Sequence, residues 1–370
     1  MKSMASDVAD NAALPLSVVI PAYNRETMIG RAVQSAFAQT PRPPAEVIVV
    51  DDCSDDATGA VAREHGATVI RHETNRGEGG ARNTGIAHAK HPWIALLDSD
   101  DEWLPHLLDT LWRLRGGHVL VGAASLNCGD DPGADRFAGT TKTQPAVLRS
   151  PAALIYPENY VAASGTMVRA DAVRAVGGYD ETLSHGADLD LWLRVLEHGS
   201  GVVAPVVGVI YHLHDGQVTN DYRTMAERQL HVLRSYADRD WWSASKVEAW
   251  RGAGAWDDLR RALRSRDRGD ALGRAAFIAR DPRRAAGVAG VLARRARLRR
   301  RSAAVTRKGT PTVTRLDTPH ALLHAARRPP GVVVVDSRAK ALAARAIGSR
   351  PVSSDQLAHA TRAPWSPEGR

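Results

Sequence analysis

Short apolar runs alternate with amphipathic segments of helical length over residues 16–115, and this alternation constrains the fold more than any other feature. Strands are expected at 16–20, 46–50, 68–70 and 93–97, and helices at 25–38, 57–65, 78–89 and 102–115. Strands that alternate with helices predict an open α/β sheet, mostly parallel and flanked by helices. Ligands of such sheets bind beyond the carboxyl ends of the strands, so polar residues there are the candidates for function.

The strict alternation ends after residue 115. Further strands are expected at 119–125, 161–168 and 202–211, and helices at 187–198, 223–237 and 245–266. We divide the chain into a flexible N-terminus (1–15), one α/β domain (16–222), a helical basic region (223–308) and a small appendage or partly disordered tail (309–370). A run of four valines before Asp336 is the only strand signal in that tail.

Charge and cysteine content limit the partners and the compartment. Lys and Arg total 49 against 41 Asp and Glu, and residues 251–308 hold 18 Lys and Arg against 5 Asp. This region fits either a basic helix on an anionic membrane surface or a solvated basic helix. Nucleic-acid binding is not expected, because no aromatic interleaving or known module is present.

Cys53 and Cys128 form no metal or disulfide pattern, and we find neither a signal peptide nor a membrane-spanning run, so a cytoplasmic location is expected.

The strongest chemical signal is the acidic run Asp98-Ser99-Asp100-Asp101, which directly follows an expected buried strand. Carboxylates gathered at a strand end repel one another unless a cation joins them. A divalent cation such as Mg²⁺ or Mn²⁺ prefers oxygen ligands and completes its shell with water and phosphate oxygens. The competing interpretation is that Asp101 caps a helix beginning near Glu102 while the other acids are solvated.

A second acidic cluster, residues 51–56, follows the second expected strand. A carboxylate at this place can accept a hydrogen bond from a nucleobase N–H or a ribose hydroxyl. Ser54 or Asp55 is expected to cap the next helix, which leaves Asp51 and Asp52 for a ligand. Response regulators also pair two Asp at a strand end, but 250 further residues do not fit so small a domain.

Three weaker signals follow. The Gly-rich segment 75–85 opens a helix and could approach phosphate through its backbone N–H groups, although it is neither a dinucleotide fingerprint nor a P-loop. Asp188 is expected in the first turn of a helix and off its apolar stripe. There it could act as a general base, or the helix dipole alone could explain the carboxylate. His212 and His214 share one face of a strand and could contact a metal or phosphate, or be structural.

Seven segments, in this order, resemble family 2 glycosyltransferases, which have the GT-A fold. They are VVIPAYNRE (18–26), VIVVDDCSDD (47–56), NRGEGGARNTGI (75–86), IALLDSDDEW (94–103), GGYDE (177–181), ADLDLWLR (187–194) and YHLH (211–214). The resemblance covers roughly residues 15–222. It departs from the family at Ala187, where Glu is usual, and at His212, where Arg is usual.

The resemblance implies roles for the matching positions. Asp188 would be the catalytic base, and Asp100, Asp98 and His214 would hold Mn²⁺ or Mg²⁺. The nucleotide-sugar site would comprise Pro21, Ala22, Tyr23, Asn24, Glu26, Asp51, Asp52, Gly77, Arg82, Asn83, Asp98 and Ser99.

The expected function is inverting transfer of a sugar from a nucleoside-diphosphate sugar to an acceptor hydroxyl. Acceptors in surface polysaccharide, glycolipid or natural-product glycosylation fit this class. Two alternatives stay open. One is a nucleotidyltransferase that makes a nucleoside-diphosphate sugar, which would usually carry a Gly/Lys-rich phosphate loop near its first strand. The other is an inactive nucleotide-binding scaffold.

Overall fold

The computed structural model describes residues 12–128, 137–138, 145–155, 161–212, 214, 222–264, 268–280, 282, 285–286, 288–290 and 292–293. The expected appendage 309–370 lies outside these residues. The first strand begins at Leu14, whose side chain is fully buried, so it includes the last two residues of the N-terminal segment 1–15.

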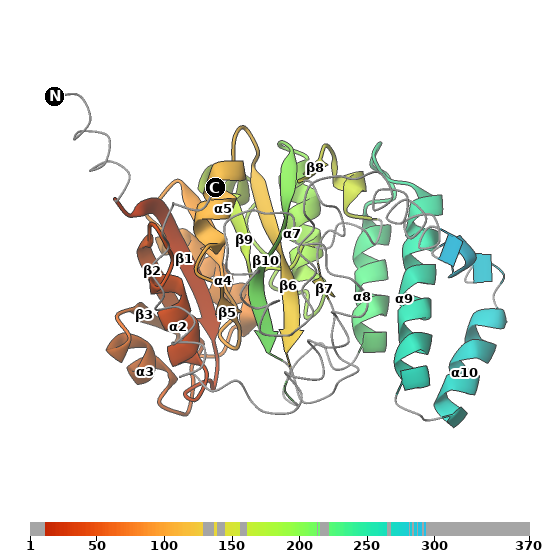
Figure 1. Ribbon diagram of the computed structural model, residues 1–370, viewed down its shortest axis with the longest axis horizontal. Coiled ribbons are helices and arrows are strands. Elements are labelled where there is room, and N and C mark those ends of the chain that lie inside the picture. Colours follow the sequence, from red (N-terminus) through yellow and green to blue (C-terminus); the bar gives the residue numbers. More distant parts are fainter. Residues whose placement is uncertain are drawn as a thin grey trace, which may run out of the picture.

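A single sheet runs through the molecule, and Figure 1 shows it with helices packed around it. Its main strands, in spatial order, are β3 (Thr68–Arg71), β2 (Pro44–Asp51), β1 (Leu14–Ala22), β4 (Trp93–Leu96), β9 (Thr166–Arg169), β6 (Leu120–Cys128), β10 (Gly201–His212) and β5 (Glu102–Trp103). Two short strands, β7 (Phe137–Ala138) and β8 (Ala146–Leu148), pair with β6 and β10. The predicted α/β class is confirmed. The N-terminal half, β3-β2-β1-β4, is parallel as expected, whereas the whole sheet is mixed.

The antiparallel strand β9 explains how residues far apart in sequence meet. β9 runs antiparallel to β4 on one side and to β6 on the other, and β6 is parallel to β10. The strands β1, β2, β4, β6 and β10 therefore all point the same way. Their carboxyl ends form one edge of the sheet, and this edge carries the acidic clusters and the histidines.

One sequence-based boundary is wrong. Residues 102–103 were expected to start a helix, but they form β5 and pair with Ile210 and Val209 of β10. The helix α5 (Leu107–Leu114) begins only after Pro105. Trp103 is buried against the sheet, so tertiary pairing with β10 overrides the local helical pattern.

Helices cover both faces of the sheet because side chains alternate along each strand. Val18 and Ile20 pack in one core cluster with α2 (Ile29–Phe37), α3 (Thr58–Glu64) and α5. Val19, between them, faces the other cluster, which contains α4 (Gly77–His88), α6 (Ala170–Ala175) and α7 (Ala187–Leu196).

Three further helices lie side by side beyond the end of the sheet opposite β1–β3 (Figure 1). They are α8 (Tyr222–Ser235), α9 (Ala244–Arg264) and α10 (Arg268–Ala279). α8 packs against α7, α9 against α8, and α10 against α9. Among the helices described, none is long and apolar enough to cross a bilayer.

The packing of α4 on β1 generates a stability prediction. A Cβ atom at Gly85 would lie 2.3 Å from Cγ1 of the buried Val19, whereas one at Gly79, in the same helix, would lie no closer than 3.7 Å to its neighbours. We expect Gly85→Ala to lower the free energy of unfolding by about 1–3 kcal/mol through overpacking. Gly79→Ala should raise it by up to about 1 kcal/mol, because alanine favours the helix. Urea denaturation measures both, and equal effects would contradict the packing argument.

Candidate active site

Arg82, which α4 carries at the carboxyl edge of the sheet, brings three carboxylates together. Its Nη2 atom lies 2.6 Å from Oδ1 of Asp98 and 2.5 Å from Oε1 of Glu78, and its Nη1 atom lies 3.2 Å from Oδ1 of Asp188. The guanidinium is almost completely buried. Asp98 follows β4, Asp188 starts α7, and Glu78 precedes Arg82 by one helical turn. Arg82 therefore joins the acidic motif after β4 to the expected catalytic carboxylate.

Burial and crowding shape the charges around Arg82. Burial raises the pKa of Asp98 to about 7, a shift that Arg82 opposes while Glu78, Asp100 and Asp188 add to it. Burial alone would lower the pKa of Arg82, but the surrounding acids hold it well above its usual value. The cluster thus has more negative than positive groups, which is the electrostatic setting of a cation site.

The acids after β4 meet two histidines, His212 at the end of β10 and His214 two residues beyond it. Nε2 of His214 lies 2.9 Å from Oδ2 of Asp100, and Nε2 of His212 lies 3.5 Å from Oε2 of Glu102. The pairing of β5 with β10 causes this juxtaposition. His214 thus reaches the acidic motif, as the sequence-based assignment requires.

Asp101 does not cap a helix, contrary to one sequence-based interpretation. α5 begins at Leu107, and its N-cap residue makes no side-chain cap. Both carboxyl oxygens of Asp101 are buried. Burial, with Asp98 and Asp100 nearby, raises the pKa of Asp101 well above the usual range, while hydrogen bonds from the Ser164 side chain and the His212 backbone oppose the shift.

The expected metal ligands fit a divalent cation that is held partly by the protein and partly by substrate oxygens. Asp98 and Asp100 offer hard oxygen atoms, and His214 contacts Asp100. In the part of the chain that the structure describes, no three His, Cys, Asp or Glu side chains form a ready-made cage. Mg²⁺ is commonly held by one or two carboxylates plus phosphate oxygens and water, so such a cage is not required.

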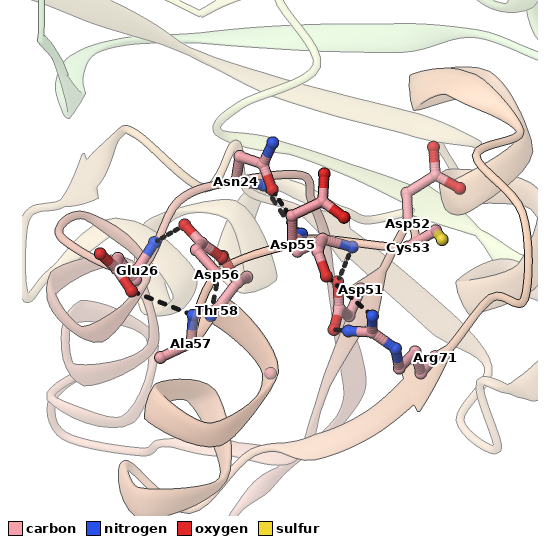
Figure 2. Close-up of polar contacts among 12 residues, drawn as sticks. Asn24, Glu26, Asp51, Asp52, Cys53, Asp55, Asp56, Ala57, Thr58 and Arg71 are labelled. Atoms are coloured by element: carbon pink, nitrogen blue, oxygen red, sulfur yellow. Dashed lines mark hydrogen bonds and ion pairs between the residues drawn. The ribbon is translucent and has the colours of Figure 1, made fainter.

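Asp51 at the end of β2 serves the protein itself (Figure 2). Arg71, which lies opposite it in the parallel register of β3, places Nη1 2.5 Å from Oδ2, and the backbone N–H of Ser54 donates to Oδ1 over 2.9 Å. The carboxylate is 1% exposed. Its oxygens are thus engaged in fixing the turn after β2.

Asp52 is differently placed, and its side chain points away from the cluster around Asp51 (Figure 2). Its Oδ1 atom is 2.6 Å from Nδ1 of His72 and accepts the backbone N–H of Arg76 over 2.9 Å. Within the described residues, no hydrogen bond engages Oδ2. The side chain is 4% exposed. One carboxylate oxygen of Asp52 thus fixes its orientation, while the other keeps its hydrogen-bonding capacity.

The loop after β1 is tied to the loop after β2 (Figure 2). Oδ1 of Asn24 accepts the N–H of Asp55 over 2.8 Å, and Oε2 of Glu26 accepts that of Ala57 over 3.0 Å. Asp56 in return accepts the N–H groups of Glu26 and Thr58. Ser54 or Asp55 had been expected to cap α3, but neither does. The carboxylates of Asp56 and Glu26 accept the backbone N–H groups there instead.

The remaining expected donor-site residues are spread along the same edge. Pro21 and Ala22 lie in β1 opposite Val50 and Asp51, and Tyr23 beyond them is 43% exposed. Ser99 is buried in the acidic motif. The backbone N–H of Gly77 donates to Oδ1 of Asn75 over 3.0 Å, so it is already engaged. The amide of Asn83 is directed at the backbone of Tyr179.

Asp188 lies in the first turn of α7, as predicted, and its side chain is one-third exposed. The helix begins after Gly186, whose φ of 78° favours glycine. An exposed carboxylate that also contacts Arg82 can reach a substrate hydroxyl and keep a fixed orientation.

Sequence reasoning gave no role to two residues of this cluster. Glu78 could have been found, because Glu and Arg four residues apart on a helix commonly pair. The ring of Tyr179 lies 5.1 Å from the guanidinium carbon of Arg82, and the residue is buried. Its segment, GGYDE, belongs to the resemblance, but no local pattern indicates which residue its ring contacts.

Comparison with known proteins confirms the family resemblance. Residues 17–172 match the family described as Glycosyl transferase family 2. The succinoglycan biosynthesis protein ExoO of Rhizobium meliloti is 33% identical over 224 residues, which cover 56% of this chain and 63% of the relative. The pre-mycofactocin glycosyltransferase of Mycobacterium tuberculosis is 30% identical over 210 residues, covering 55% and 43%. The chain thus spans between two fifths and two thirds of these relatives. The sheet confirms the α/β class, and the matched residues run from β1 through β9.

Solved structures are more distant. The mannosyltransferase PcManGT from Pyrobaculum calidifontis, in complex with GDP-Man and Mn²⁺, has a TM-score of 0.48 and 19% identity, covering 76% of this chain and 80% of its own. TarS of S. aureus in complex with UDP-GlcNAc has a TM-score of 0.47 and 16% identity, covering 70% and 89%.

The raised pKa of Asp98 predicts a pH-dependent stability. A carboxyl whose pKa rises from 3.8 to about 7 on folding binds more protons in the folded state, so stability falls as pH rises from 4 to 7. In EDTA, the free energy of unfolding should drop by about 1–3 kcal/mol between pH 5 and pH 7.5, since partial exposure reduces the effect. Asp98→Asn should flatten this drop in urea denaturation. An identical pH dependence in both proteins would show that Asp98 does not cause it.

Proposed function

We propose that this chain is an inverting glycosyltransferase that moves a sugar from a nucleoside-diphosphate sugar to an acceptor hydroxyl. The observation that carries the proposal is the contact of one buried arginine, Arg82, with both Asp98 and Asp188. It puts a candidate cation site beside a candidate base at the ligand-binding edge of the sheet. The family match over residues 17–172 and the names of the relatives support the same reaction class.

The nucleoside would lie at the ends of β1 and β2. The free Oδ2 of Asp52 can accept one hydrogen bond from a base N–H or a ribose hydroxyl. The loop at Tyr23, Asn24 and Glu26 would form the neighbouring wall, since its bonds to the 54–58 loop hold it in place. Asp51, already bound to Arg71, would support this wall from behind.

The diphosphate would lie beside Asp98, Asp100 and His214, which would hold Mn²⁺ or Mg²⁺ together with phosphate oxygens. Such a cation stabilises the charge that develops on the leaving diphosphate. Arg82 would contribute positive charge at the same place. In the present structure Arg82 contacts Asp98 and His214 contacts Asp100. On donor binding, these residues would instead contact the diphosphate and the cation.

In the transfer step, Asp188 would accept the proton of the acceptor hydroxyl. The acceptor oxygen attacks the anomeric carbon, and the bond from that carbon to the diphosphate oxygen breaks. The electron pair of that bond leaves with the nucleoside diphosphate, so one displacement inverts the anomeric carbon. The 3.2 Å contact between Arg82 and Asp188 would hold the base in position beside the donor.

The acceptor and the location are also part of the proposal. The name of the relative ExoO supports a role in polysaccharide biosynthesis, and a glycolipid or natural-product acceptor is compatible with the same chemistry. We place the enzyme in the cytoplasm, peripheral to the inner membrane face. The basic excess of residues 251–308 and the exposed Leu263, Leu272 and Leu292 support a membrane contact.

The test of the reaction class is nucleotide-sugar binding. UDP-, GDP- and dTDP-sugars should be titrated by calorimetry with Mn²⁺, with Mg²⁺ and with EDTA. We expect binding of one nucleoside diphosphate that EDTA weakens, and a smaller effect of EDTA in Asp100→Ala, which already lacks one ligand. Absence of binding by every donor with either metal would overturn the proposal.

Asp188→Asn tests the base. The amide keeps the size of the side chain but cannot take the proton, so kcat should fall by about 10²–10⁴-fold. Donor affinity should be retained. Asp171→Asn, an exposed acid paired with Arg169, is the matched control and should leave kcat unchanged. Near-normal turnover by Asp188→Asn would remove this residue from the mechanism.

Sedimentation with lipid vesicles tests the membrane contact. The full chain should co-sediment with vesicles containing phosphatidylglycerol, less with neutral ones, and less again in high salt, because the attraction is electrostatic. A protein lacking residues 280–308 should bind less if this region is responsible. Equal recovery with neutral and anionic vesicles would contradict it.

A further inference from the structure

The side-chain amide of Asn83 is bonded to a distant segment of the chain. Its Nδ2 atom donates to the carbonyl of Tyr179 over 2.9 Å, and its Oδ1 atom accepts the N–H of Tyr179 over 2.7 Å. Nδ2 also lies 2.9 Å from Oε1 of Glu181. The amide thus pairs with one residue's backbone as a neighbouring strand would. Both of its polar atoms are already used, although the resemblance suggests that Asn83 contacts the donor.

The partner segment has the shape that this pairing needs. Gly177 and Gly178 have φ values of 82° and 72°, which side chains rarely allow. A Cβ atom at Gly178 would lie 2.4 Å from Oδ1 of Asn83. Only glycine at this position lets the amide approach the backbone so closely.

Tyr179 links this pairing to the reaction centre. Its ring is buried and lies 5.1 Å from the guanidinium carbon of Arg82, within the range of a cation–π contact. Arg82, the neighbour of Asn83 in α4, in turn contacts Asp98 and Asp188. One side of the guanidinium is therefore supported by a ring whose backbone Asn83 holds.

A second clamp connects the same segment to α7. Nη1 of Arg194 donates to the carbonyl of Val176 over 2.7 Å, while its other nitrogens bind Asp190. Arg76 also pairs with Glu181 at 3.1 Å. Residues 176–181 are thus fastened to α4, which carries Arg82, and to α7, which carries Asp188.

We infer that Asn83 is a positioning residue that acts on the reaction through residues 178–179, and that it does not contact the donor. By holding Tyr179 against Arg82, it sets the place of Arg82 relative to Asp98 and Asp188. The inference rests on the proposed glycosyl transfer at this site. The turn at Gly177 and Gly178 has the same positioning role, because it lets the backbone of Tyr179 come close to Asn83.

The experiment compares Asn83→Ala, Gly178→Ala and the double variant with wild type. Asn83→Ala removes the clamp, and Gly178→Ala displaces it by collision. Each should lower kcat by about 10- to 10²-fold, as a misplacement of the reacting groups does, while KM for the donor changes by no more than roughly threefold. The double variant should be no slower than the slower single variant, because both changes break one contact. Amide hydrogen exchange of residues 177–183 should rise in all three.

Ser17→Ala is the matched control, because it removes the 2.7 Å hydrogen bond from the buried Ser17 to the half-buried Glu46 at the opposite edge of the sheet. It should leave kcat unchanged, so that loss of stability alone is separated from the clamp. Two outcomes would overturn the inference and make Asn83 a donor contact. One is that the losses of kcat in the two single variants multiply in the double variant. The other is that KM for the donor rises enough to explain the whole loss of kcat/KM while hydrogen exchange at 177–183 is unchanged. Should Asn83→Ala not fold, Gly178→Ala alone decides through its kcat and exchange. A wild type that binds no nucleotide sugar would instead refute the proposed function.

Discussion

The ionic contacts of Arg82 hold together carboxylates that would otherwise repel one another. Glu78, Asp98 and Asp188 come from a helix, a strand end and a second helix, and each lies within 3.2 Å of the same guanidinium. Because the guanidinium is buried, these contacts are weakly screened and their geometry is fixed by packing. Burial raises the pKa of Asp98 to about 7 even though Arg82 opposes the shift, because Glu78, Asp100 and Asp188 add to it.

The direction of β9, inside the sheet, makes this arrangement possible. β9 lies between β4 and β6 and is antiparallel to both. β6, and β10 beside it, therefore have their carboxyl ends at the same edge as β1, β2 and β4. His214 can then meet Asp100, although 114 residues separate them. The short pairing of β5 with β10 brings the acidic motif and the histidines to the same place.

The acids at this edge divide into those that serve the fold and those that remain available to a ligand. Asp51 is bound by Arg71, and Asp56 satisfies the backbone of two loops, so both stabilise the wall of the site. Asp188 is one-third exposed, whereas Asp52 is buried and keeps one carboxylate oxygen without a hydrogen bond to the described residues. Neighbours in sequence thus have opposite tasks, because alternate residues of a chain leaving a strand face different surroundings.

The sequence by itself determined the α/β class, the strands of the parallel half and the position of Asp188 in the first turn of α7, because these depend on local periodicity and on helix-start signals. Ordered motifs also indicated the family. Tertiary structure decided what local patterns do not contain. Residues 102–103 pair with β10, and Asp101 is buried and caps no helix. At the start of α3, Asp56 and Glu26 take the place expected for Ser54 or Asp55. It also decided that Tyr179 and Asn83 meet beside Arg82. These outcomes depend on contacts between segments about 30 to more than 100 residues apart, whose energies arise only once the sheet has brought them together.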